Sequence, residues 1–135
     1  MQQYADSIFI LTIIITTVIL QALIASVAHR KQDHYIPGIV APDLDHHSFV
    51  FRSNRAFLNS LENVPTFVLT ALLAMFASVD VDQLYVTVSI FAVARIIHMA
   101  LFYKIATNKN PSPRSYFYVI GLLAQLYLLG LLFTV

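Results

Sequence analysis

Polar and ionisable residues interrupt the apolar stretches of this sequence, and their types suit the binding of an anion. Arg55, Asn59 and Glu62 follow the i, i+4, i+7 spacing that places side chains on one face of a helix. Arg95 and His98 lie three residues apart and share a face of a later stretch. Because guanidinium groups form paired hydrogen bonds with carboxylates and phosphates, these residues predict a ligand that carries such groups.

A third polar group opens the last apolar stretch. Arg114 and Ser115 lie about one helical turn before Tyr118. The sequence has no cysteine, which excludes a disulfide, a thiolate metal site and a cysteine nucleophile. Any thiol chemistry near these residues must therefore use a thiol that a ligand brings in, and we predict no metal site.

The residues around these polar groups are those of a membrane protein. Of 135 residues, 59% are hydrophobic and 11% are charged, whereas a soluble domain carries about 25% charged residues. A membrane-spanning helix needs about 20 mainly apolar residues, and four stretches of this chain approach or meet that need. We therefore predict an all-α fold, a four-transmembrane-helix bundle that forms a single membrane domain over residues 1–135. The expected spans are about residues 5–29, 51–78, 83–104 and 113–134.

Lysine and arginine residues gather in two of the three connections between these spans. The first connection, residues 29–55, holds four of them, and the third, residues 104–114, holds three. The second connection carries Asp80 and Asp82 and neither Lys nor Arg. The positive-inside rule then places the first and third connections in the cytoplasm and both termini outside. All three polar groups fall toward the cytoplasmic side. The short termini favour a bacterial inner membrane.

The ionisable residues inside the spans also have structural interpretations. Such residues usually face a bundle interior or a wet cavity, and they often mark a functional site. However, Glu62 could form an ion pair with Arg95 that fixes helix packing, or it could neutralise Arg55, or bind a ligand ammonium group. His98 could be a hydrogen-bonded packing residue.

Polar residues near the ends of the spans are explained more simply. Arg52 is interpreted as an anchor at the lipid headgroups, and His46 and His47 as a solvated pair in the first loop. Tyrosines near span ends are expected in the aromatic belts of membrane proteins. Tyr103 and Tyr118 gain interest because they lie close to the charged residues.

At the polar groups the sequence resembles the MAPEG family, the membrane-associated proteins in eicosanoid and glutathione metabolism. RAFLNSLENVPTF, residues 55–67, resembles the family's second-helix pattern R-A-x-x-N-x-x-E-N-x-P-x-F. ARIIH, residues 94–98, resembles the third-helix motif A-R-x-x-H, and PRSYFY, residues 113–118, resembles the start of the fourth helix. The match covers roughly residues 50–121, with the three motifs in the family's order and spacing.

The resemblance implies a homotrimer that binds glutathione between neighbouring subunits, near the cytoplasmic face. It assigns to Arg114 the stabilisation of the glutathione thiolate, since an adjacent cation lowers the pKa of a thiol. It assigns to Ser115 a hydrogen bond to the same sulfur. The implied ligand contacts are Arg55, Asn59 and Glu62 from one subunit and Arg95, His98, Arg114, Ser115 and Tyr118 largely from its neighbour.

The implied activity is that of a membrane-bound glutathione transferase that serves detoxification. Glutathione is then the co-substrate, and the thiolate attacks a hydrophobic electrophile or lipid dissolved in the bilayer. A lipid hydroperoxide peroxidase activity is a further expectation. The expected partners are these molecules, membrane lipids and other copies of the chain. The net charge of +1 gives no indication of nucleic acid binding.

The sequence departs from the family pattern at several positions. Phe57 and Leu58 stand where several members carry His or Arg, and Phe102 stands where Tyr is frequent, one turn after the third-helix His. Tyr103 is adjacent, so the hydroxyl contact to the ligand is either lost or displaced to that residue. Some members use an Arg near the end of the first helix, for which Arg30 is the nearby residue here.

Other functions remain as alternatives. A non-catalytic lipid-binding scaffold of the same family is the main one, and retention of Asn59, Glu62 and Arg114 favours the enzyme over it. A proton-coupled efflux protein would need a buried acid in its first span, whereas residues 7–28 carry no charge. A haem bundle would need histidines on facing helices, and His98 alone lies inside a predicted span.

Overall fold

The structure is a computed structural model, which describes residues 1–134. Within these residues the chain forms a short 3₁₀ helix, η1 (Gln2–Tyr4), and four α-helices. All four α-helices are long and apolar enough to cross a membrane, which confirms the predicted helical class and number of spans. The α-helices are α1 (Ala5–Arg30), α2 (Phe49–Phe76), α3 (Val81–Lys104) and α4 (Pro113–Leu132).

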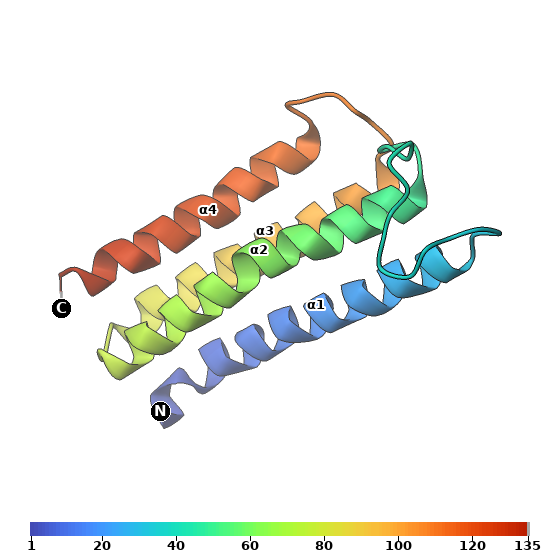
Figure 1. The fold of residues 1–135 in the computed structure, drawn as a ribbon. Helices are drawn as coiled ribbons and strands as arrows, with labels where there is room; N and C mark the ends of the chain where they lie inside the picture. Colours follow the sequence, from blue (N-terminus) through green and yellow to red (C-terminus); the bar gives the residue numbers. More distant parts are fainter. Residues whose placement is uncertain (135) are drawn as a thin grey trace.

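The helices run alternately up and down and lie side by side (Figure 1). The inner pair, α2 and α3, pack against each other and against both α1 and α4. Between them, the buried rings of Phe67 and Phe91 stack face to face with centroids 3.6 Å apart. Large apolar side chains such as Leu69 and Leu73 point outward and are exposed, which is favourable when lipid surrounds the bundle.

The short turn between α2 and α3 is closed by hydrogen bonds. Ser78 adopts a left-handed conformation (φ 58°), and the amide of Val79 donates to the carbonyl of Ala74 at 3.0 Å. This pattern is a common way to end a helix. The buried hydroxyl of Tyr4 donates to the Val79 carbonyl at 2.6 Å, so the start of the chain is tied to the same turn.

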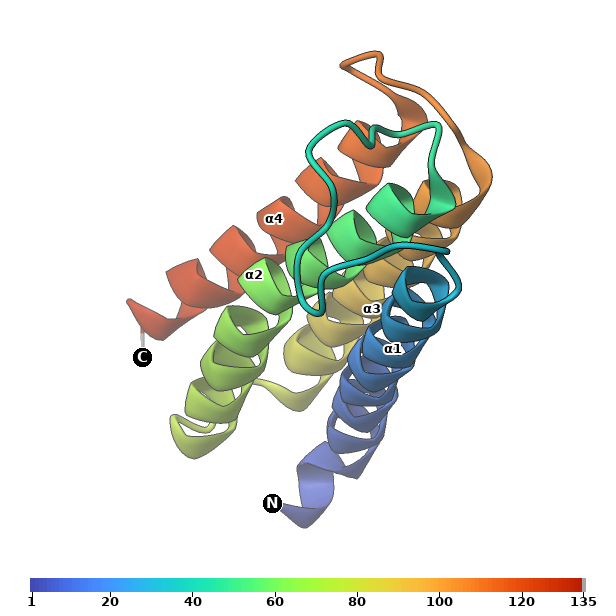
Figure 2. The ribbon, with the colours of Figure 1, turned by 45° about the vertical axis from the view of Figure 1, so that its right-hand side comes forward.

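The two long connections, residues 31–48 and 105–112, lie together at the opposite end of the bundle, which we call the loop end (Figure 2). Asn108 Nδ2 donates to Asp45 Oδ2 at 2.7 Å, and the backbone amide of His46 donates to Asn108 Oδ1 at 3.2 Å. We call these three residues the loop clasp. The hydrogen bond from Asn108, with a second from the His47 amide, holds the pKa of Asp45 below its ordinary value.

Arg52 fixes the first loop instead of anchoring the helix at lipid headgroups, so that interpretation of the sequence was wrong. Its side chain is only 9% exposed, and Nη1 donates to the carbonyls of His46 and His47 at 2.8 and 2.9 Å. Nη2 reaches the carbonyl of Tyr103 at 3.5 Å. Arg52 therefore positions the clasp over the ends of α2 and α3.

Candidate functional site

A cavity of about 570 Å³ lies at the loop end, between α2, α3, α4 and the two loops. We call it the loop-end cavity. A single chain supplies its walls, including residues that the family resemblance assigns to two neighbouring subunits. The predicted site residues that line it are Arg55, Asn59, Glu62, His98, Arg114, Ser115 and Tyr118.

Arg55 and Glu62 form an ion pair on the cavity face of α2. Arg55 Nη1 donates to Glu62 Oε1 at 3.0 Å, and Nη2 donates to Oε2 at 3.3 Å. The two side chains are 39% and 52% exposed. Glu62 therefore neutralises Arg55, and the alternative ion pair with Arg95 was wrong. Since exposed pairs contribute about 0–1 kcal/mol, both charges can exchange this contact for a ligand at little cost.

Arg95 lies behind the wall of the cavity. The residue is 4% exposed, and Nη2 donates to Asn59 Oδ1 at 2.7 Å and to Ser60 Oγ at 3.4 Å. The Ser60 hydroxyl in turn donates to Gln21 Oε1 of α1 at 2.9 Å. This buried polar chain links α1, α2 and α3. It fixes the Asn59 amide, which itself lines the cavity.

Arg114 is held at the cavity by three hydrogen bonds. Nε donates to Ser112 Oγ at 3.2 Å, Nη2 donates to the Thr107 carbonyl at 2.8 Å, and Nη1 lies 3.1 Å from His46 Nδ1. The guanidinium also lies over the ring of Phe102, 4.4 Å from its centroid. A guanidinium has five N–H groups. Two of them therefore have no partner among residues 1–134, and Arg114 is one of the residues that line the cavity.

Phe102 and Tyr103 differ in their relation to the loop-end cavity. Phe102, which stands where relatives often have Tyr, is buried beneath Arg114 and contributes its ring face to that cation. The Tyr103 hydroxyl is buried and has no hydrogen-bond partner in the described chain, residues 1–134. Because Tyr103 is not among the residues that line the loop-end cavity, its hydroxyl does not replace the missing one there.

Ser115 has a structural role as well as a place in the cavity wall. The amide of Ser112 donates to Ser115 Oγ at 3.2 Å at the start of α4, and the hydroxyl reaches Asn110 Oδ1 at 3.5 Å. Serine at such a position completes the hydrogen bonds of a helix end. The long contact to Asn110 is weak, so the hydroxyl proton can be redirected to a ligand.

His98 and Tyr118 close the side of the cavity toward α3 and α4. His98 is 3% exposed, and its ring packs edge-on against Phe102, with centroids 4.9 Å apart. The Tyr118 ring lies 6.5 Å from His98 and is 36% exposed. His98 is therefore a packed wall residue, whereas Tyr118 stands at the rim.

His46 also lines the cavity and is half-buried, so it is more than the solvated loop residue that the sequence predicts. Its ring packs edge-on against Phe51 and lies near Phe102, with centroids 4.9 and 5.8 Å away. Burial, followed by the positive charge of Arg114, lowers the pKa of His46 below its ordinary value. His47 is exposed, as predicted. No local spacing in the sequence distinguishes the two histidines.

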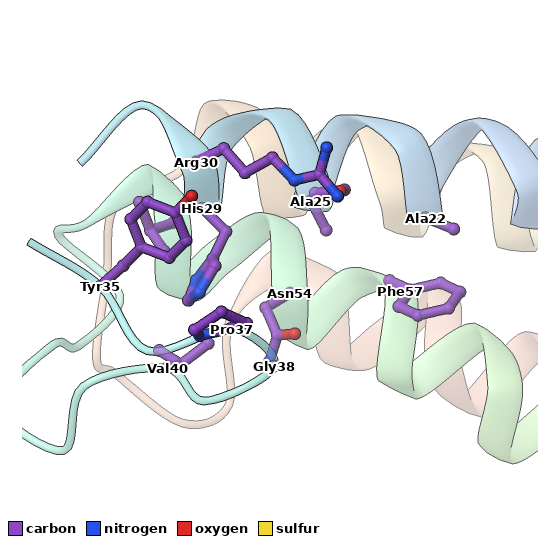
Figure 3. A pocket seen from close by; sticks show the side chains of 12 residues that line it. Ala22, Ala25, His29, Arg30, Tyr35, Pro37, Gly38, Val40, Asn54 and Phe57 are labelled. Carbon is purple, nitrogen blue, oxygen red and sulfur yellow. The ribbon is translucent and has the colours of Figure 1, made fainter.

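Arg30 belongs to a second cavity, of about 450 Å³, between the end of α1, the first loop and the start of α2 (Figure 3). His29 and Tyr35 pack edge-on in its wall, and His29 Nε2 lies 2.9 Å from the carbonyl of Ile36. Phe57, one of the departures from the family pattern, lines this cavity too. Arg30 and Phe57 thus share a surface that is separate from the loop-end cavity.

Comparison with known proteins agrees with this architecture. A family model described as the MAPEG family matches residues 7–134, nearly the whole chain. No curated protein and no solved structure matches significantly. The match, the four apolar helices and the three motifs that meet at the loop end lead to one assignment: the chain is an integral, multi-pass membrane protein that belongs to the MAPEG family.

Proposed function

We propose that this protein is a membrane-bound glutathione transferase that conjugates the glutathione thiolate to hydrophobic electrophiles. Family membership supports glutathione or eicosanoid chemistry at a membrane in general terms. The observation that carries the specific proposal is the meeting of three groups at the loop-end cavity. These are the exchangeable pair of Arg55 and Glu62, the fixed amide of Asn59, and the two spare N–H groups of Arg114.

The charges of the cavity complement those of glutathione, which carries two carboxylates, one ammonium group and a thiol. A volume of about 570 Å³ falls within the range of small-molecule sites. In the proposed complex Arg55 binds a carboxylate by paired hydrogen bonds and releases Glu62 for the ammonium group. Asn59, His98 and Tyr118 complete the polar wall, while Arg95 contributes through Asn59.

The proposed reaction uses Arg114 to lower the pKa of the bound thiol. A cation beside sulfur favours the thiolate, and a hydrogen bond from Ser115 adds to this effect. The sulfur then forms a bond to an electrophilic carbon, the bond from that carbon to its leaving group breaks, and the thiol proton goes to water. Peroxidase activity toward lipid hydroperoxides is a related activity that we propose to assay beside conjugation.

The first test is turnover by the purified protein in detergent, with glutathione and a chlorodinitrobenzene as the electrophile. Saturable conjugation would support the proposal. Glutathione binding without turnover would point to a different electrophile or thiol-dependent isomerisation. Absence of both would refute the transferase and favour the lipid-binding scaffold, for which bound lipid would be identified next.

Glu62→Gln is expected to weaken glutathione binding about tenfold, because the ammonium group loses a charged partner. Folding is expected to be unaffected, since the exposed pair with Arg55 contributes little stability. Calorimetric titration with glutathione measures the effect. Asp43→Asn, which removes an exposed acid of the same loop end, is the matched control. Loss of folding in Glu62→Gln would instead assign the pair a structural role.

We further propose that the whole chain, as one membrane domain, assembles as a homotrimer with the loop end in the cytoplasm of a bacterial inner membrane. Lysine and arginine are concentrated in residues 29–55 and 104–114, in the two loops and the helix ends beside them, which supports this orientation. Native mass spectrometry of the detergent-released protein is expected to give the mass of three chains. A monomeric mass that retains conjugating activity would contradict the trimer.

A further inference from the structure

We infer that His46 is a positioning residue, which holds the guanidinium of Arg114 at the cavity only while its imidazole is neutral. This inference rests on the proposed function, because its consequence is that thiol activation fails in acid. Nothing in the three sequence motifs includes His46, which lies in the first loop, 68 residues before Arg114.

The contact between the two side chains fixes the protonation state of the imidazole. Arg114 Nη1 lies 3.1 Å from His46 Nδ1. A guanidinium can only donate, so Nδ1 must accept, and the ring proton must lie on Nε2. A doubly protonated imidazole would face Arg114 with an N–H group. The hydrogen bond would be lost, and two positive charges would repel each other.

Contacts from several elements hold the imidazole in this position. The backbone amide of His46 donates to Asn108 in the loop clasp, and its carbonyl accepts from Arg52. Phe51 of α2 and Phe102 of α3 pack against the ring. The ring is therefore placed by groups that do not depend on Arg114, as a positioning residue requires.

Charges around His46 oppose its protonation. The cations Arg52 and Arg55 of α2 and Arg114 of α4 all disfavour the charged imidazole, whereas the neighbouring Asp45 favours it. Burial has the largest effect, and together these causes lower the pKa of His46 from 6.5. The other titratable groups that line the same cavity are Glu62, His98, Lys109 and Tyr118.

The direction of the pH effect follows from this shift. Above pH 6.5 His46 is neutral, and Arg114 is held in place. As the pH falls through the lowered pKa, His46 becomes charged and the guanidinium loses one of its three acceptors, the one that faces Nη1. The positive charge of a protonated His46 would by itself stabilise the bound thiolate. We expect protonation of His46 to destabilise the thiolate instead, because it displaces Arg114 from its position at the cavity.

The test compares four forms of the protein by the ultraviolet absorbance of bound glutathione thiolate, between about pH 8 and about pH 5. In His46→Asn the amide Oδ1 takes the place of Nδ1 and accepts from Arg114 but cannot be protonated. In the wild type we expect loss of the thiolate absorbance on acidification to be coupled to the uptake of more than one proton. In His46→Asn we expect it to be coupled to the uptake of a single proton. We expect His46→Ala to lower the thiolate-to-thiol ratio about tenfold throughout, which is one pKa unit. His47→Asn is expected to match the wild type.

A second measurement does not depend on glutathione. ¹⁵N spectra of histidine-labelled protein in detergent are expected to show His46 protonated at Nε2, with a pKa below the ordinary histidine value of 6.5. In Arg114→Gln the pKa of His46 is expected to rise. The inference is refuted if the pKa of His46 is instead 6.5 or higher. It is also refuted if the thiolate of His46→Asn is lost in acid in the same way as that of the wild type. If the tautomer is as expected but wild-type protein neither forms thiolate nor conjugates glutathione, the proposed function fails, and thiol activation by this pair fails with it.

Discussion

Arg114→Gln is expected to lower the rate of glutathione conjugation by about 100-fold, the order found when one preorganised charge-stabilising donor is removed from an active site. Glutamine keeps a hydrogen-bond donor at this position but loses the positive charge that would lower the pKa of the thiol. Conjugation of a chlorodinitrobenzene at saturating glutathione measures the loss. The effect should decrease at high pH, where the free thiol ionises without assistance.

Two controls separate this effect from a general loss of charge or of fold. Lys104→Gln removes an exposed cation at the same end of the bundle, outside the loop-end cavity, and should leave turnover unchanged. Arg114→Lys keeps the charge but cannot reproduce three hydrogen bonds in a fixed geometry, so an intermediate rate is expected. Unchanged turnover in Arg114→Gln would remove Arg114 from the mechanism.

Asn59→Leu is expected to destabilise the folded protein by about 3 kcal/mol, because it removes the acceptor of a buried charge. Arg95 donates to Asn59 Oδ1 at 2.7 Å, and its second acceptor, Ser60 Oγ, lies at the longer distance of 3.4 Å. The loss is measured as a lower midpoint of unfolding by sodium dodecyl sulfate in mixed micelles, in the absence of glutathione. Binding of the ligand then plays no part in the result.

The double variant Asn59→Leu with Arg95→Met distinguishes a lost hydrogen bond from a packing defect. Removal of both partners leaves neither an unpaired charge nor an unpaired amide, and apolar replacements of buried ion pairs are often tolerated. We therefore expect the double variant to recover much of the stability that Asn59→Leu loses. Equal loss in both variants would show that the shape of the Leu side chain, and not the charge of Arg95, causes the effect.

Helical periodicity explains which parts of the site could be predicted from the sequence. Arg55, Asn59 and Glu62 share a face because their spacing alone sets their directions around α2, and all three line one cavity. The spacing of Arg95 and His98 does not show whether both side chains reach the same cavity. Residues three apart differ by about 60° around a helix axis. This difference is enough for His98 to reach the cavity while Arg95 lies behind Asn59.

The role of His46 could not be predicted, because it depends on contacts between distant segments. The ring meets Arg114 in a loop whose position depends on the hydrogen bond from Asn108 to Asp45, 63 residues earlier in the chain, and on the one from Arg52 to the His46 carbonyl. Sequence patterns report the directions of side chains within one helix. They carry no information on how two irregular loops will meet. The same limit explains why Arg52 was assigned to the membrane surface.

The rim of the loop-end cavity has a consequence for the choice of acceptor. On α4, Tyr118 and Val119 line the cavity and are also 36% and 46% exposed, within a helix apolar enough to cross a membrane. Under the proposed function, an apolar acceptor reaches the sulfur from the bilayer, while glutathione arrives from water. The protein would then act as a phase-transfer catalyst. Among acceptors of equal reactivity, turnover should follow the partition coefficient into the bilayer and not the solubility in water.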